Sequence, residues 1–427
     1  MMELYAHQKE ALERTKDFTS CAYYHDMGLG KTFTGAEKLI SLGSTINLIV
    51  CQKSKVDDWV KHFHVNYPAK YIVCNLTKKD LFGAFMVNVK YHKNAIVVGI
   101  INYELAFRRP ELLKLRNVAL MLDESQYIQN ERTKTYKFIS KLDISHCVLL
   151  SGTLTGGKYE KLWTQCHLLG WKISKADFWK RYIDYRLWHP APLMPPIKIV
   201  TGYKNVEELK TNLRKHGADF LKTEDVLTLP EQVFNTLFCG PSVTYKRFCR
   251  QSLVTVEGKE LVGDTTLTKL LYRRQLCGLY STEKLKKFSD LIASTDSRVI
   301  VFYNFTGELE RLRTVIGERP CSVVNGQVKD LSAYETHENA IVFVQYQAGS
   351  MGLNLQKANH IIYYTLPLSS MHFEQSKKRI HRIGQKDTCF YYTLLVKGSI
   401  EEKIFETLKK RKDYTEKLFE LDRLFGG

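Results

Sequence analysis

Continuous apolar runs of strand length recur along the first 150 residues of this 427-residue chain. They are CAYY (21–24), INLIV (46–50), AIVVGII (95–101), VALML (118–122) and CVLL (147–150). Between them, apolar residues recur at helical spacing, as Phe33, Ala36 and Ile40 do. Buried parallel strands that are covered by helices on both faces produce this pattern. The sequence therefore predicts an α/β layer fold with a parallel sheet.

The pattern changes between about residue 158 and residue 280. Two aromatic stretches, KYEKLWTQCHLLGW and DFWKRYIDYRLW, predict helices. The stretch HPAPLMPPIK at 189–198 predicts loop or extended chain, because proline neither donates to a sheet nor continues a helix. Mixed helical sequence is expected from there to about residue 280.

Apolar runs of strand length return in the last third of the chain. They are RVIVFYNF (298–305), AIVFVQY (340–346) and HIIYYTL (360–366), and they predict a second α/β lobe. The final stretch from Ser399 predicts one long helix. Its recurring face holds Ile404, Leu408, Thr415, Leu418 and Phe419.

These patterns divide the chain into three parts. We expect a first lobe at 1–230 with a helical, proline-rich insertion at about 158–220. A helical connector is expected at 231–280, followed by a second lobe at 281–427 that ends in the helix.

Composition adds a candidate partner. Lys plus Arg number 63 against 45 Asp plus Glu, which gives a net charge of +18. A surplus of this size favours a polyanionic partner such as nucleic acid, although solubility alone is an alternative reason for it. No apolar run is long enough to span a bilayer, and no secretory signal is visible, so we expect a cytoplasmic protein. The ten cysteines include no C-x-x-C pair and predict reduced core residues rather than a zinc site.

Three short stretches carry candidate chemistry. The first is HDMGLGKT at 25–32, where Gly28 and Gly30 permit a tight backbone, Lys31 supplies a cation and Thr32 a hydroxyl. A phosphate-binding loop needs these groups between a strand and a helix, and the surrounding sequence provides both. Because the usual first glycine is replaced by His25, a chance match is the alternative at this point.

The second stretch is DESQ at 123–126, directly after the apolar run VALML. Asp123 and Glu124 would lie at the carboxyl end of a buried strand, where a doubly wound sheet binds its ligand. One acid can hold Mg²⁺ and the other can activate water. The alternative is a solvated turn after a strand.

The third stretch is QSKKRIHRIGQ at 375–385. Arg379 and Arg382 are three residues apart, so on a helix they would share a face and could stabilise charge on a phosphoryl group. The alternative is a solvated basic helix or a localisation-like cluster.

Taken together and in this order, these stretches resemble the motifs of the Swi/Snf-type helicase-like ATPases of superfamily two. The resemblance spans Leu4 to about Lys412. The further matching stretches are LYAHQ (4–8), VCQKSKVDDW (50–59), SGT (151–153), KTEDVLTLP (222–230), VIVFYNF (299–305) and AGSMGLNL (348–355). Departures from the family pattern are His25-Asp26 for Asp-Glu, Gln126 for the usual histidine and Leu154 for proline. We assign His25 no catalytic role and expect a packed or solvated histidine.

The resemblance implies two RecA-like doubly wound lobes with helical insertions between them and a C-terminal helix. It implies ATP and Mg²⁺ as cofactors and double-stranded DNA as a partner bound without sequence preference. The implied ATP-binding residues are Gln8, Asp26, Met27, Gly28, Leu29, Gly30, Lys31, Thr32 and Gly352. The implied catalytic residues are Lys31, Asp123, Glu124, Arg379 and Arg382, with Thr32 and Asp123 holding Mg²⁺.

The same resemblance implies two further groups of residues. Contacts to DNA are implied for Lys53, Ser54, Gly349 and Asn354. Coupling between ATP chemistry and lobe motion is implied for Gln126, Ser151, Gly152, Thr153 and Gln375. Because Gln126 replaces a histidine, coupling could differ even where hydrolysis is intact.

The implied function is a DNA-dependent ATPase that moves along duplex DNA. The alternatives are a strand-separating helicase acting on DNA or RNA, an ATP-switched clamp or loader, and a scaffold with an inactive ATP site. The short flanks suggest a compact prokaryotic or viral motor without targeting domains, monomeric, with replication or recombination proteins as further partners.

Overall fold

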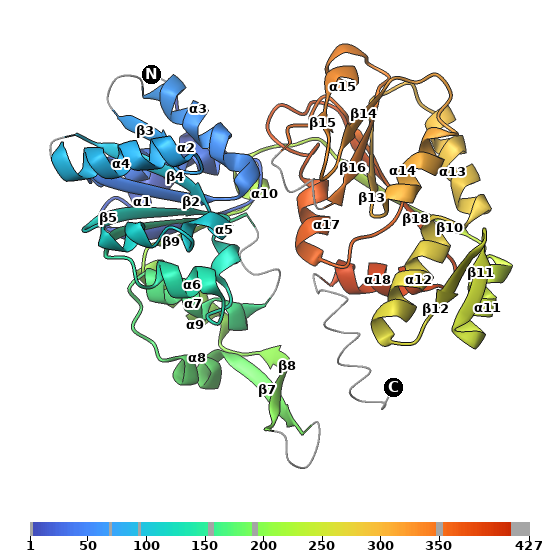
Figure 1. The fold of residues 1–427 in the computed structure, drawn as a ribbon, viewed down its shortest axis with the longest axis horizontal. Coiled ribbons are helices and arrows are strands. Elements are labelled where there is room, and N and C mark those ends of the chain that lie inside the picture. The colour runs from blue at the N-terminus through green and yellow to red at the C-terminus, as the bar shows by residue number, and fades with distance from the viewer. Residues whose placement is uncertain are drawn as a thin grey trace. The chain divides into compact units, whose positions relative to one another are not determined.

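The computed structural model describes residues 3–67, 71–92, 95–152, 158–189, 195–346 and 353–410. The chain forms two compact units, Met1–Leu227 and Thr228–Gly427 (Figure 1). Several residues from the sequence predictions lie outside the described ranges: Thr153, Gly349, Gly352, and Thr415, Leu418 and Phe419 of the final stretch.

The first unit contains a seven-stranded sheet in the order β3-β4-β2-β5-β6-β1-β9. Every neighbouring pair in it is parallel, as the apolar runs predicted. The strands are β1 Ser20–His25, β2 Ile46–Cys51, β3 Ile72–Asn75, β4 Val97–Asn102, β5 Val118–Asp123, β6 Ile144–Leu150 and β9 Ala218–Leu221.

Helices cover both faces of this sheet. Successive strand residues alternate between two cores: Leu120 and Leu122 pack on one face, and Ala119 and Met121 on the other. Because both faces are buried, the strands read as continuous apolar runs. The helices are α1 Ala6–Arg14, α2 Lys31–Ser41, α3 Val56–Asn66, α4 Lys79–Tyr91, α5 Tyr103–Ala106, α6 Lys134–Ile139, α7 Trp163–Leu168, α8 Lys175–Tyr182, α9 Val206–Lys215 and α10 Thr223–Val226.

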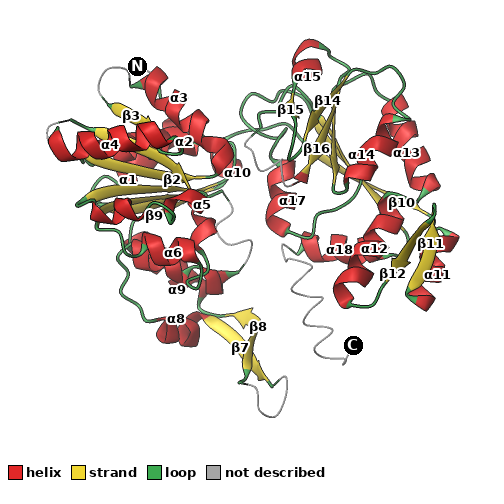
Figure 2. Cartoon of the chain, viewed as in Figure 1, coloured by secondary structure: helices red, strands yellow, loops and turns green. Residues whose placement is uncertain are grey.

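The insertion at 158–220 differs in part from the prediction. Helix α8 ends at Tyr182, and the remainder of the aromatic stretch forms strand β7, Ile183–Trp188. This strand pairs antiparallel with β8, Ile197–Tyr203, in a separate two-stranded sheet (Figure 2). The prediction of a helix through residue 188 was therefore wrong. Aromatic residues also favour strands, and pairing with β8 stabilises residues 183–188 as a strand.

The second unit contains another seven-stranded sheet, in the order β10-β18-β17-β13-β16-β14-β15. Its pairs are parallel except β14 with β15. The strands are β10 Gln232–Cys239, β13 Val299–Tyr303, β14 Cys321–Val324, β15 Lys329–Asp330, β16 Ile341–Gln345, β17 His360–Tyr363 and β18 Cys389–Val396.

The segment 231–280 differs from the helical connector that we expected. Strand β10 is an edge strand of the second sheet and pairs with β18 over its whole length. An edge strand is covered less than a central one, so its sequence QVFNTLFC lacks a continuous apolar run. The segment also contains a hairpin, β11 Leu253–Val256 with β12 Lys259–Val262. Its helices are α11 Val243–Gln251 and α12 Thr266–Gly278.

The remaining helices of the second unit complete its two cores. They are α13 Thr282–Ala293, α14 Thr306–Arg313, α15 Ser332–Thr336, α17 Ser370–Lys377 and α18 Ile400–Lys409. In α18, Ile404 and Leu408 are buried as the predicted helix face requires. Among the described residues, no helix is long and apolar enough to cross a bilayer.

A buried ion pair joins α13 to α18. Lys284 Nζ lies 2.6 and 2.8 Å from the two carboxylate oxygens of Glu401, and the two side chains are 0% and 3% exposed. The backbone N–H of Val396 also donates to Glu401. Breaking such a pair leaves one charge buried without its partner.

We therefore expect Lys284→Met to destabilise the second unit by about 3–5 kcal/mol. The matched control is Lys286→Met on the exposed side of the same helix, expected to change stability by less than about 0.5 kcal/mol. Urea unfolding followed by circular dichroism compares the two. Equal stability of the two variants would contradict the assigned role of the ion pair.

Candidate nucleotide-binding site

The predicted motif residues of the first unit gather at the carboxyl edge of its sheet. Strands β5, β6 and β1 are consecutive in the sheet order, and β2 pairs with β5. Since these strands are parallel, the segments that follow them leave at the same edge. These segments hold the glycine loop after β1, Lys53 and Ser54 after β2, the acids at the end of β5, and Ser151 with Gly152 after β6.

The glycine loop folds into a turn that ends at the start of α2. Gly28 and Gly30 have positive φ angles of 91° and 71°, and Gly30 is the residue before the helix. Lys31 Nζ donates to the carbonyl oxygens of His25 and Asp26 at 2.8 and 2.9 Å, which folds the side chain back over the loop. Thr32 is exposed in the first turn. A helix N-terminus behind a glycine turn favours an anion.

Gln8 packs against this loop. Its amide nitrogen donates to the carbonyl oxygens of Leu29 and Gly30 at 3.4 and 3.1 Å, and its amide oxygen accepts from Tyr5 N at 2.9 Å. The side chain is buried. A Cβ atom on Gly30 would lie 2.3 Å from Gln8 Nε2, so it would displace the end of that side chain from its hydrogen bonds, and the positive φ favours glycine as well.

Asp123 and Glu124 lie at the end of β5. Trp59 Nε1 donates to Asp123 Oδ2 at 2.9 Å. Burial, and then the charge of Glu124, raise the pKa of Asp123, while Trp59 and the cations Lys55 and Lys31 oppose the rise. Glu124 has a positive φ of 57°, a strained conformation for a non-glycine residue that concentrates at functional sites.

Gln126 connects Glu124 to Ser151. Its amide nitrogen donates to Glu124 Oε2 at 2.7 Å, and its amide oxygen accepts from Ser151 Oγ at 2.8 Å. A glutamine can donate and accept at once, so it bridges the two predicted motifs. Beside this bridge, a Cβ on Gly152 would meet Met27 at 2.7 Å and Lys31 Nζ at 3.0 Å. The structure therefore brings the loop, the acid pair and the residues after β6 together.

His25 is buried and bound to the last strand of the unit. Its Nε2 lies 2.7 Å from Asp219 Oδ2, and Arg14 donates to the same carboxylate. Burial lowers the pKa of His25. A packed histidine is thus confirmed. The neighbouring carboxylate of Asp26 accepts from Thr223 N and Oγ1 at 3.1 and 3.2 Å.

The predicted DNA-contacting residues of the first unit lie in a short 3₁₀ turn, Lys53–Lys55. Lys53 is exposed and Ser54 half-buried. Both follow β2 at the same edge as the glycine loop.

In the second unit, the prediction that Arg379 and Arg382 share a helix face is wrong. Helix α17 ends at Lys377, and both arginines lie in the turns after it. Arg379 Nη1 donates to Leu353 O at 3.4 Å, and Arg382 Nη1 donates to Asn354 Oδ1 at 2.6 Å. The turns are stabilised by hydrogen bonds across the loop rather than by a helical ladder.

Gln375 is buried in α17, while Gln385 ends the same motif. Gln385 Nε2 donates to the carbonyl oxygens of Gln356 and Ala358 at 3.2 and 2.9 Å. Its Oε1 accepts from the next two backbone N–H groups. This side chain holds the arginine turns against the segment that contains Asn354.

Sequence reasoning gave no role to several residues that the structure places at these sites. They are Arg14, Gln165, Asp219, Thr223 and Gln385. Gln165, for example, is buried and accepts from Ser125 Oγ at 2.8 Å and from Tyr24 OH at 3.0 Å. Arg14, Gln165 and Asp219 lie outside the motif stretches and have partners distant in sequence, whereas Thr223 and Gln385 lie within stretches that the sequence analysis named.

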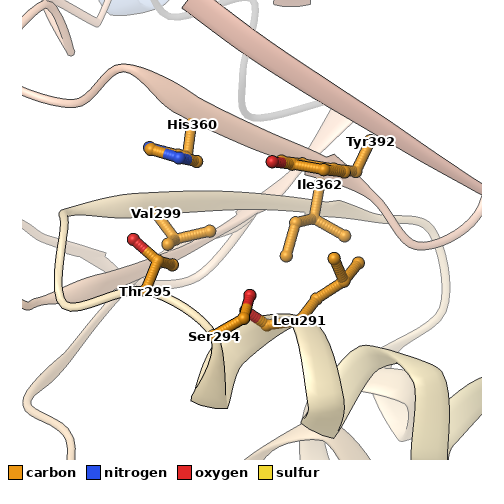
Figure 3. Close-up of a pocket in the computed structure, with 7 residues that line it drawn as sticks. All are labelled: Leu291, Ser294, Thr295, Val299, His360, Ile362 and Tyr392. Carbon is orange, nitrogen blue, oxygen red and sulfur yellow. The ribbon is translucent and has the colours of Figure 1, made fainter. Parts of the chain in front are cut away.

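A cavity of about 120 Å³ in the second unit lies away from these motifs (Figure 3). Val299 and His360, which line it, are the first residues of β13 and β17, so it opens near the amino ends of the strands. Ligand sites of drug size occupy about 300–1,000 Å³. This cavity is too small for a nucleotide.

Two parallel α/β units, the first with a glycine loop and an acid pair at one sheet edge, define a helicase-like protein. The profile of the SNF2-related domain matches residues 7–280, and that of the helicase conserved C-terminal domain matches residues 283–384. The chain belongs to the SNF2-related family, the Swi/Snf-type helicase-like ATPases of superfamily two. The resemblance found in the sequence motifs is confirmed.

Its relatives include bacterial and animal proteins. YwqA of Bacillus subtilis, a candidate ATP-dependent helicase/translocase, is 25% identical over 95% of this chain and 47% of its own length. The ATP-dependent helicase YqhH of Bacillus subtilis is 24% identical over 93% of this chain and 76% of its own length. The mouse DNA repair and recombination protein RAD54B is 25% identical over 89% of this chain. The chain spans 51% of RAD54B, so it covers about half of two of these three relatives.

Among solved structures, the Sulfolobus solfataricus SWI2/SNF2 ATPase core in complex with dsDNA is similar over 96% of this chain and 91% of that one. The sequence identity is 18% and the TM-score 0.46.

The contact between Gly30 and Gln8 leads to a stability prediction. We expect Gly30→Ala to destabilise the first unit by about 3 kcal/mol, from a left-handed φ and from overpacking against Gln8. Gly43→Ala is the matched control, because Gly43 has a similar φ of 66° but nothing within 4 Å of a Cβ. The control should cost only about 1–2 kcal/mol.

Urea unfolding followed by tryptophan fluorescence measures both variants, since all five tryptophans lie in the first unit. Combining Gly30→Ala with Gln8→Ala should recover part of the difference. Equal losses in Gly30→Ala and Gly43→Ala would show that the Gln8 contact carries no energy.

Proposed function

We propose that this chain is an ATP-dependent motor that translocates along double-stranded DNA. The observation that carries the proposal is the common edge of the first sheet, where Lys31, the acid pair Asp123–Glu124 and the Gln126–Ser151 bridge meet in an SNF2-related chain. A cation, two acids and a hydrogen-bonded link to a neighbouring strand are what coupled triphosphate hydrolysis requires.

The glycine loop would bind the triphosphate. Backbone N–H groups at the start of α2 and the Lys31 ammonium provide positive charge, and Lys31 would exchange its two carbonyl partners for phosphate oxygens. Glu124 would accept a proton from the attacking water. Gln8 would bind the adenine base. Because its amide nitrogen also donates to carbonyl oxygens of the glycine loop, this binding would depend on the conformation of the loop.

The residues of the acid pair fit a divalent cation. Burial, and then the charge of the adjacent Glu124, raise the pKa of Asp123, and a bound cation would favour the ionised form of this carboxylate. Asp123 and Thr32 would hold Mg²⁺, whose chemistry is to neutralise phosphate charge. Trp59 fixes the carboxylate of Asp123 through its 2.9 Å hydrogen bond.

Arg379 and Arg382 of the second unit would act on the same triphosphate. Guanidinium groups stabilise charge that develops on a transferring phosphoryl group. If the two arginines must approach the triphosphate for each turnover, hydrolysis depends on closure of the two lobes. Repeated closing and opening would then move the protein along DNA. The Glu124–Gln126–Ser151 hydrogen bonds offer one route by which the state of the nucleotide reaches the segment after β6.

Duplex DNA is the proposed track. The net charge of +18 suits a polyanion, and the relative RAD54B is named a DNA repair and recombination protein. Lys53, Ser54, Asn354 and Gly349 are the proposed phosphate contacts. Phosphate contacts position the protein on DNA and do not distinguish one base from another. Binding should therefore be independent of the DNA sequence and sensitive to salt.

ATP turnover with blunt duplex DNA, single-stranded DNA and RNA at one salt concentration tests the proposal. We expect blunt duplex DNA to stimulate ATP turnover most. We also expect the protein to displace a third strand from duplex DNA and to leave a forked substrate unseparated. Glu124→Gln should lower turnover by about 10²–10⁴-fold while duplex binding persists, because it removes a base and no DNA contact.

Other outcomes identify other functions. Stimulation by forked DNA or RNA with strand separation would indicate a helicase. ATP binding without phosphate release in the wild-type protein would indicate a clamp or loader, and absence of ATP binding would indicate a scaffold.

The arginine role is tested separately. We expect Arg382→Ala to lower DNA-stimulated turnover by on the order of 10³-fold, as the loss of an arginine that stabilises transferring phosphate does. Lys386→Ala, an exposed cation four residues further, is the matched control and should retain wild-type turnover. Near-normal turnover of Arg382→Ala would show that this residue is misassigned.

A further inference from the structure

The insertion of the first unit concentrates charge and aromatic residues. Residues 158–204 contain nine Lys and Arg but only three Asp and Glu. They also contain four of the five tryptophans of the chain. A third of the surplus positive charge therefore lies in about a tenth of the sequence, outside every motif assigned above.

The centre of this insertion is the hairpin β7–β8, which projects beyond α8 and away from the main sheet of the first unit (Figures 1 and 2). Phe178, Tyr182, Ile183 and Ile199 are buried and anchor its base. Beyond the base, Tyr185, Leu187 and Ile197 remain 38%, 53% and 37% exposed. The hairpin thus has a fixed base and an exposed outer part.

An aromatic and cationic cluster shapes one face of this hairpin. Lys198 Nζ lies 4.4 Å from the ring centre of Tyr185 and 5.1 Å from that of Trp179. The two rings meet edge to face at 5.6 Å. Leu187 pairs directly with Lys198 across the strands and so lies beside the cluster. Since an isolated two-stranded hairpin is marginally stable, these contacts help to keep it ordered.

The cations around the hairpin fall into two groups. Arg181 and Lys204 are paired with Glu208 and Asp184. In contrast, Lys180, Arg186 and Lys198 are exposed, and within the part of the chain that the structure describes they form no ion pair with a carboxylate. Three cations without acidic partners leave a local positive field on an exposed element.

We propose that the β7–β8 hairpin with the end of α8 is an additional contact for duplex DNA, separate from the motif residues. Lys180 and Arg186, both exposed, bind backbone phosphates of the duplex. The proposal rests on the proposed function, because it names a second place at which the same DNA is held. Contact at an element far from the glycine loop lengthens the bound duplex without adding sequence preference.

The chemistry favours nucleic acid over a protein partner. Lysine is depleted from the buried centres of protein interfaces, whereas protein–DNA interfaces are polar and strongly positive. Arg186 lies between Tyr185 and Leu187 in β7, so its side chain is on the other face of the hairpin from theirs, and the cations do not surround an apolar centre. Phosphates can neutralise each cation in turn, and release of counterions provides the favourable free energy.

Duplex binding across a range of salt concentrations tests the hairpin. We expect Lys180→Ala with Arg186→Ala to reduce the slope of log Kd against log salt by about two, since each lost phosphate contact removes about 0.9. At about 0.1 M salt this corresponds to roughly 10- to 100-fold weaker binding. Lys90→Ala with Lys114→Ala removes two exposed cations from elsewhere in the first unit and is the matched control.

A second variant separates charge from folding. Lys180→Arg with Arg186→Lys keeps both charges and should bind duplex as the wild type does, while thermal unfolding compares the stability of all variants. The proposed duplex contact is overturned if the alanine pair binds duplex DNA as tightly as the control pair does. It is also overturned if the alanine pair loses affinity for single-stranded DNA alone. Wild-type protein without duplex binding or DNA-stimulated turnover would instead refute the proposed function itself.

Discussion

The parallel direction of β1, β5 and β6 is the constraint on which the candidate site depends. Because the three strands are neighbours and run the same way, residues from three distant segments end at one edge of the sheet. This common direction brings Lys31, Glu124 and Ser151 to the same edge of the sheet. Hydrogen bonds then set their details: the ammonium of Lys31 on two loop carbonyls, and Gln126 between an acid and a hydroxyl.

Gln126, which departs from the family pattern, connects two of the predicted motifs. A histidine at this position can donate and accept through its two ring nitrogens, and the glutamine amide does the same without a titrating group. In this chain the side chain that bridges the acid pair and the segment after β6 has no titrating group of its own. Gln126 bonds to Glu124 through its amide nitrogen and to Ser151 through its amide oxygen.

Much of the fold could be predicted from the sequence, because strands buried on both faces are continuously apolar. VALML and CVLL became β5 and β6 for this reason. Strands β7 and β10 could not be predicted in this way, because they are less covered and their sequences are aromatic or mixed. The candidate site residues that lie within a motif could also be predicted from the sequence. Trp59 on Asp123 and Asp219 on His25 are contacts across 64 and 194 residues, and only the folded chain reveals the pairing.

The attachment of the glycine loop to β9 has a consequence for dissecting the chain. Asp219 holds His25, Thr223 holds Asp26, and the backbone of Asp26 bonds to Leu221 O. The glycine loop near the beginning of the first unit is thus held by the last strand of that unit's sheet and by the turn after it. A fragment that stops before residue 218 would retain every residue of the glycine loop and would lose Asp219, Leu221 and Thr223, which hold it in place.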